Sequence, residues 1–192
     1  MVIDAFSAEV EPGGLTSQND IKILVCYLVK SVPNVLKDTN IAQILRDKGL
    51  ANYFEIMDAI SALTKKGHII KDENDFFSLS ETGMSIALSL DYSLPKSVRD
   101  KALESAFAML KHAKIEKENP VDIISTDSGF DVTCHVKGGD FDMMKISLYA
   151  PDKEQAEMIK KNFQKDPEYV YSLMLSALVG DKEYVKSLFE EN

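Results

Sequence analysis

Residues 63–83 read LTKKGHIIKDENDFFSLSETG, and this stretch decides the fold of the N-terminal half of the chain. Residues 69–71 and 76–79 are rich in side chains that favour strands, and a polar turn separates them. Gly67 can end a helix with a positive φ, and Ser80 can cap the next helix. The stretch therefore predicts the end of one helix, a short β-hairpin and the start of another helix.

Before this hairpin, apolar residues recur at the spacing of α-helices. Ser17 caps a first helix that Pro33 ends, and Asp38 or Thr39 caps a short second helix. A third helix is expected over residues 52–66. The expected buried stripes are Ile21, Leu24, Val25 and Leu28 in the first helix, Ile41, Ile44 and Leu45 in the second, and Tyr53, Ile56, Ile60 and Leu63 in the third.

Three helices, a hairpin and a further helix are the element order of a winged helix-turn-helix, a module used mostly to bind duplex DNA. Spacing, order and turn residues agree on this interpretation. The alternative is a helical domain in which the hairpin is incidental. The order assigns residues 15–93 to a winged helix-turn-helix domain that follows a flexible tail of residues 1–14.

Residues 94–118 are assigned to a long helix with a wide apolar stripe. Such a helix needs a partner surface, so it links two domains, pairs with its copy in a dimer, or does both. The candidate dimerisation residues are Val98, Ala102, Ala106, Phe107 and Leu110.

Residues 119–192 are predicted to form a second, α+β domain. Its strand-like segments alternate in polarity as an antiparallel meander with one buried face does, and the helices after them cover that face. The segments are residues 121–126, 129–137 and 143–149, with helices capped by Asp152, Asp166 and Asp181. The whole chain is thus of the α+β class, with an N-terminal winged helix-turn-helix followed by a long helix and a small antiparallel three-stranded sheet covered by helices.

The charge of the chain limits its function. The 192 residues include 22 Lys and Arg against 31 Asp and Glu, for a net charge of −9. Most nucleic-acid-binding proteins are basic, so this balance argues against broad, nonspecific DNA affinity. Two cysteines, the lack of an apolar run of transmembrane length and the lack of a signal-peptide pattern favour a cytoplasmic protein with reduced thiols.

Several short segments carry a resemblance over most of the chain. They are DIKIL at 20–24, LSETG at 79–83, LPKSVR at 94–99, AP at 150–151, EQA at 154–156, NF at 162–163 and YVY at 169–171. In this order they resemble a bacterial family of winged-helix proteins of about this length, whose function is not characterised. The resemblance implies a transcriptional regulator, by analogy of fold, and supplies no catalytic residues.

Acids occupy the positions at which winged-helix repressors touch DNA. Counting back from Leu63 places Asn52, Glu55, Asp58 and Ala59 on the outer face of the third helix. An asparagine such as Asn52 can read adenine. The two acids repel phosphates. Each could accept a hydrogen bond from cytosine N4, but only if nearby cations hold the helix in place. The candidate DNA-contacting residues are Lys48, Asn52, Tyr53, Glu55, Asp58, Ala59, Lys65, Lys66 and Lys71.

Two functions remain open from the sequence. One is a dimeric DNA-binding transcriptional regulator whose C-terminal domain dimerises or senses a ligand. The alternative is a non-enzymatic protein-interaction module that presents its acids to a basic partner and does not bind DNA. No catalytic motif occurs, and His68, His112 and His135 lack metal-ligand spacing, so no enzyme activity, cofactor or metal is expected.

Overall fold

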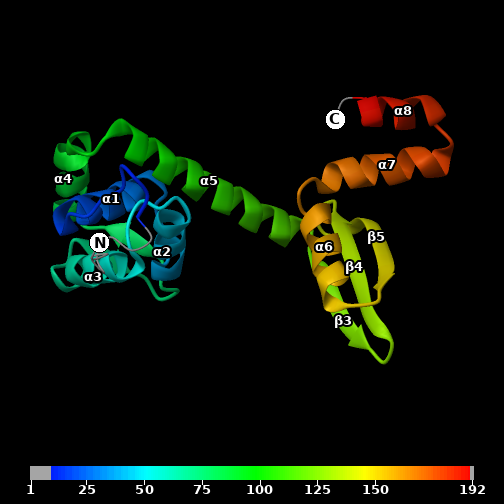
Figure 1. Cartoon of the computed structure of the whole chain (residues 1–192), viewed down its shortest axis with the longest axis horizontal. Helices are drawn as coiled ribbons and strands as arrows, with labels where there is room; N and C mark the ends of the chain where they lie inside the picture. The colour runs from blue at the N-terminus through cyan, green and yellow to red at the C-terminus, as the bar shows by residue number, and fades with distance from the viewer. Residues whose placement is uncertain (1–9, 191–192) are drawn as a thin grey trace. The chain divides into compact units, whose positions relative to one another are not determined.

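The computed structural model describes residues 10–190 of the chain (Figure 1). They form a mixed α+β arrangement that divides into two compact units between Leu110 and Lys111. Within this part of the chain no helix combines the length and the apolar character needed to cross a bilayer. Of the predicted flexible tail, residues 1–9 lie outside the described residues.

The N-terminal unit has its elements in the order expected from the sequence. Gly49, with a φ of 59°, follows the second helix, and Gly67, with a φ of 69°, follows the third, as their predicted turn roles require. The elements are α1 (Gln18–Ser31), α2 (Asp38–Asp47), α3 (Tyr53–Lys65), β1 (Ile69–Lys71), β2 (Phe77–Leu79), α4 (Glu81–Leu90) and a short 3₁₀ helix, η1 (Asp91–Ser93).

Helix α1 is the central element of this unit, and Figure 1 shows it between α3 and α4. The predicted stripe of α1 is fully buried, as is Cys26, and Ile23 and Val29 on its other faces are also buried. Elements therefore pack on several sides of α1, whereas the sequence periodicity had indicated one buried face.

The hairpin β1–β2 is antiparallel, with Ile69 opposite Leu79. Phe77 is completely buried, and its backbone also bonds to the loop between α1 and α2. Its N–H donates to the carbonyl oxygen of Leu36 at 2.9 Å, and its own carbonyl accepts from Asn34 at 3.2 Å. The loop thus extends the hairpin on its second edge, and Phe77 anchors both to the core.

Helix α5 (Lys96–Glu118) contributes its first turns to the core of the N-terminal unit. Val98, Ala102 and Ala106 are buried there, and Leu110 packs partly against the same core. The assignment of these residues to a dimer interface is therefore wrong for the three buried side chains, which could meet a second chain only if the core opened. Phe107 alone of the five is well exposed, at 57%.

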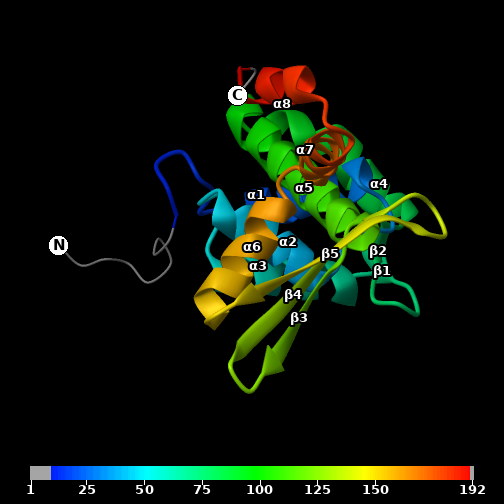
Figure 2. The same ribbon diagram turned by 90° about the vertical axis from the view of Figure 1, so that its right-hand side faces the viewer.

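The C-terminal unit is a three-stranded antiparallel sheet in the order β3–β4–β5, covered on one face by α6 (Figure 2). Val132, Cys134 and Val136 of β4 pack against Ala156 and Phe163 of α6. The predicted caps are confirmed, because Asp152, Asp166 and Asp181 each accept a backbone hydrogen bond three residues on. The elements are β3 (Val121–Thr126), β4 (Gly129–Lys137), β5 (Asp142–Ala150), α6 (Lys153–Phe163), α7 (Pro167–Val179) and α8 (Lys182–Glu190).

Candidate nucleic-acid interface

The start of α3 is held by Asn52. Its side-chain oxygen accepts from the N–H of Phe54 at 2.9 Å, and the residue is only 7% exposed. A side chain that caps its own helix and is buried is not available to read a base edge. The expected contact between Asn52 and adenine is therefore wrong.

The solvent-facing side of α3 is a stripe of four residues, which we call the outer stripe: Phe54, Asp58, Ser61 and Lys65. Their spacing of four, three and four residues keeps them on one helical face. Phe54 is 78% exposed, while Ser61 is half-buried at the middle of the stripe. Phe54 and Ser61 were missed in the sequence, where the same spacing could have identified them.

The sequence-based stripe was wrong because Ala59 belongs to the buried face of α3. It is completely buried, beside Ile56 and Ile60. Glu55 points to the flank instead, where its carboxylate accepts a hydrogen bond from the Gln18 side chain of α1. A small residue such as alanine carries little periodicity signal, so the count from Leu63 put these positions on the wrong side.

Of two further positions on α3, Tyr53 differs from the expected arrangement and Asp58 agrees with it. Tyr53, expected on the buried stripe and also as a DNA contact, is 40% exposed at the first turn of α3. Its ring packs edge-on against Phe54, with the ring centres 5.7 Å apart. Asp58 lies on the exposed face, as expected.

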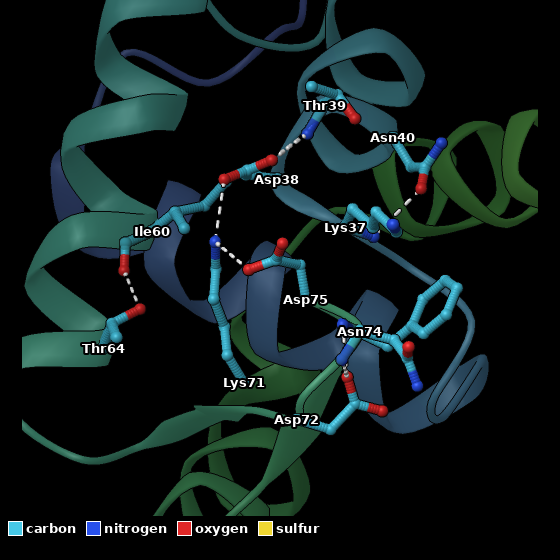
Figure 3. A network of polar contacts seen from close by, with 11 residues as sticks. Lys37, Asp38, Thr39, Asn40, Ile60, Thr64, Lys71, Asp72, Asn74 and Asp75 are labelled. Atoms are coloured by element: carbon cyan, nitrogen blue, oxygen red, sulfur yellow. Dashed lines mark hydrogen bonds and ion pairs between the residues drawn. The ribbon is translucent and has the colours of Figure 1, made fainter.

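The acidic tip of the hairpin is partly a structural device (Figure 3). The Asp72 carboxylate accepts from the N–H of Asn74 at 2.8 Å and from that of Phe76 at 2.9 Å. Asp75 has a φ of 66°, a conformation that Asp adopts more readily than most residues. Lysine or arginine at position 72 could not accept these bonds, so the turn requires a short side chain with an acceptor oxygen where DNA-binding hairpins often carry a base.

Lys71 is engaged in an ion-pair network and is not a free cation. Its Nζ lies 3.1 Å from an Asp38 carboxylate oxygen at the start of α2 and 3.5 Å from Asp75 (Figure 3). The hydrogen bond from Lys71 lowers the pKa of Asp38 below its ordinary value, and the same bond raises the pKa of Lys71. The network ties the hairpin to α2.

We expect Lys71→Met to lower the free energy of unfolding of the N-terminal unit by about 0.5–1 kcal/mol at neutral pH, because the pair is one-third exposed. A carboxyl with a lowered folded-state pKa stabilises the fold above its ordinary pKa of 3.8 and loses that effect as the pH falls through the lowered value. The gap between wild type and variant should therefore be constant near neutral pH and close at pH values well below 3.8.

Urea unfolding at a series of pH values measures this gap. Lys65→Met is the matched control, because Lys65 is exposed and has no ion pair among the described residues. A gap that persists at acid pH would mean that Lys71 acts through its position 5.3 Å from the Phe77 ring centre and not through Asp38.

The other predicted phosphate contacts differ in availability. Lys48 lies 3.7 Å from Glu104, and both side chains are exposed enough for the pair to open. Lys66 is the C-cap of α3 and lines a groove shared with α1. Of the four lysines, Lys65 is therefore the one that lies on the outer stripe.

In the C-terminal unit, His135 joins the three strands. Its Nδ1 lies 2.9 Å from Asp142 and its Nε2 lies 3.2 Å from Asp122, and the residue is 9% exposed. Each carboxylate contacts a different ring nitrogen, and the two contacts together fix the orientation of the imidazole. Within residues 10–190 no group of three or more His, Cys, Asp or Glu is placed to hold a metal ion.

The two cysteines lie in the cores of their units. Burial raises the pKa of Cys26 to about 11 and that of Cys134 to about 11. Both are therefore neutral thiols at physiological pH, and the thiolate is the reactive form of cysteine. Their surroundings favour a packing role.

The chain belongs to the family described as Domain of unknown function (DUF4364), whose model matches residues 21–178. This range runs from the first helix to the last turn of α7. The expected membership of a family of unknown function is thus confirmed. No curated protein and no solved structure matches the chain.

Proposed function

We propose that this protein is a cytoplasmic transcriptional regulator that binds DNA through a winged helix-turn-helix in its N-terminal unit. The element order α1–α2–α3–β1–β2–α4, with a solvent-exposed stripe on α3, is the observation that carries the proposal. In domains of this type the recognition helix enters the major groove of DNA, and its side chains read the base edges.

The outer stripe supplies the contacts. Lys65 pairs with a phosphate, Asp58 accepts from a cytosine N4 amino group, and Phe54 packs on a thymine methyl group. With so few unpaired cations near α3, one copy binds weakly, and two copies on a two-fold-symmetric site are needed for useful affinity.

The test is selection of genomic fragments on the purified full-length protein at low salt, followed by sequencing. We expect enrichment of one palindromic site, and about tenfold or greater weakening by Lys65→Glu with a salt slope shallower by about 1. Lys153→Glu, an exposed site on α6, is the matched charge-reversal control. Absence of any enriched site from a folded sample would reject the proposal.

In this proposed dimer, the second copy of the chain packs against α7 of the first. Residues 169–180 contain no charged side chain, and Leu175, Leu178 and Val179 are 45%, 80% and 69% exposed on one face. A helix that is apolar on all sides is normally buried. An apolar face without charge is self-complementary about a two-fold axis, which favours a copy of the same chain as the partner.

We expect Leu178→Glu to convert a dimer into a monomer, because it places a charge on the apolar face of α7 that forms the contact. Analytical ultracentrifugation of the full chain measures the state. Ala177→Glu is the matched control, since Ala177 is exposed on the opposite side of the same helix. Equal effects of the two variants would exclude this face as the interface.

One observation favours a second candidate, a protein-interaction module. Phe54 is an exposed apolar anchor that shares the start of α3 with the acids Glu55 and Asp58, a pattern that suits a basic peptide. Saturable binding of a lysine-rich amphipathic peptide that Phe54→Ala removes, without enrichment of any DNA site, would favour this candidate over DNA binding.

A further inference from the structure

A groove of about 320 Å³ lies on the flank of α3 that faces α1, away from the outer stripe. Its floor is apolar and comes from three helices. Ile23 of α1 and Leu63 of α3 are 8% and 2% exposed, and Ile86 of α4 is half-buried. The volume lies at the lower end of the range for small-molecule sites, and such sites are mostly apolar with a few polar groups that orient the ligand.

The rim of the groove is cationic. Lys22 comes from the second turn of α1, Lys66 from the C-cap of α3, and His68 from the residue before β1. No lining residue is acidic, although acids outnumber bases in the whole chain. Within residues 10–190 neither lysine has an ion-pair partner, so two positive charges face the groove without compensation.

His68 is held in place on the rim. Its Nδ1 lies 2.9 Å from the Thr82 hydroxyl, which in turn lies 2.9 Å from the hydroxyl of Ser80. The Ser80 hydroxyl donates to the backbone oxygen of His68 at 3.1 Å. Because the Ser80 hydroxyl hydrogen points at His68, Thr82 donates to Ser80 and accepts from Nδ1–H, and this chain of hydroxyls fixes the His68 ring beside the groove.

We propose that this groove binds a small organic anion, with its charged head between Lys22 and Lys66 and its apolar body on Ile23, Leu63 and Ile86. Charge-assisted hydrogen bonds hold the head, and removal of apolar surface from water holds the body. By contrast, the cavity at the end of the C-terminal sheet is lined by Asp122, Asp140 and Asp142 beside one lysine, Lys137, so its charge disfavours anions.

The position of the groove gives the ligand a regulatory consequence. It contacts α1, the last turn of α3, the residue before the hairpin and α4, so an occupant that prefers one arrangement of these elements biases the orientation of α3. This consequence rests on the proposed DNA binding, whereas the binding of the anion does not.

The probe is octanoate, below its micelle concentration, titrated into the isotopically labelled full-length protein and followed by NMR amide shifts. We expect saturable shifts at residues of α1, the end of α3, His68 and α4. Acetate carries the same head without the apolar body, and octylammonium carries the same body with the opposite charge, so both should bind much more weakly. Equal shifts with octylammonium would overturn the proposal.

Two variants locate the site. Lys22→Gln with Lys66→Gln should weaken octanoate about tenfold or more, and Ala62→Leu should abolish binding because Ala62 lines the groove. Lys65→Gln, one residue away on the outer stripe, is the matched control and should bind octanoate normally. Unchanged affinity in the double variant would reject the site. The titration contains no DNA, so its outcome is separate from that of the proposed function.

Discussion

Phe77→Ala is expected to lower the free energy of unfolding of the N-terminal unit by about 3–5 kcal/mol, the largest effect of any substitution proposed. The Phe77 ring is completely buried, and the strand that carries it is only three residues long. Removing the ring leaves a cavity between α1 and the hairpin, where the loop at Leu36 also depends on this residue. Since whole domains are stable by about 5–15 kcal/mol, the hairpin would detach or the unit would unfold.

The adjacent residue supplies the control. Phe76 is half-buried, with Lys37 Nζ 4.8 Å from its ring centre, and Phe76→Ala should cost no more than about 1 kcal/mol. Denaturant unfolding of the full chain, with hydrogen exchange of peptides from residues 15–90 to isolate the N-terminal unit, measures both. Similar losses at the two positions would contradict the assignment of Phe77 as the anchor of the hairpin.

Gly83→Ala is expected to lower the same free energy by about 2–3 kcal/mol. A Cβ at position 83 would penetrate the backbone carbonyl oxygen of His68, which is fixed because it accepts from both the N–H and the hydroxyl of Ser80. Backbone cannot rotate away as a flexible side chain does. The loss is a net value, because alanine in a helix is otherwise favoured over glycine by about 1 kcal/mol.

Thermal and denaturant unfolding measure this effect, and Leu88→Ala in the same helix is the control. Leu88 is 59% exposed, so removing a larger group there should change stability by no more than about 0.5 kcal/mol. If Gly83→Ala were neutral or stabilising, α4 would not pack against the start of β1 as closely as described.

Local sequence determined the elements of this protein almost to the residue. The turns at Gly49 and Gly67, the helix caps at Ser80, Asp152 and Asp166, and the strands of both sheets were predicted because caps, turns and periodicity act within a few residues. The α+β class follows directly from that order of elements.

The orientation of α3 depended on the tertiary structure. When a small residue lies at the edge of an apolar stripe, helical spacing alone is compatible with more than one choice of buried face. Ala59 is such a residue. Only the packing of α3 against α1 shows that Ala59 is buried, that Glu55 meets Gln18, and that the outer stripe runs through Phe54 and Lys65 instead.

Contacts between residues far apart in the chain also depended on the tertiary structure. The apolar stripe of α5 was recognised from its spacing. An apolar stripe does not reveal whether the same chain or a second copy covers it. In the structure, the core of the N-terminal unit covers most of the α5 stripe. The pairing of Lys71 with Asp38, and the cationic groove between Lys22 and Lys66, join residues 33 and 44 positions apart. Contacts of that kind depend on how helices pack, which periodicity along the chain does not encode.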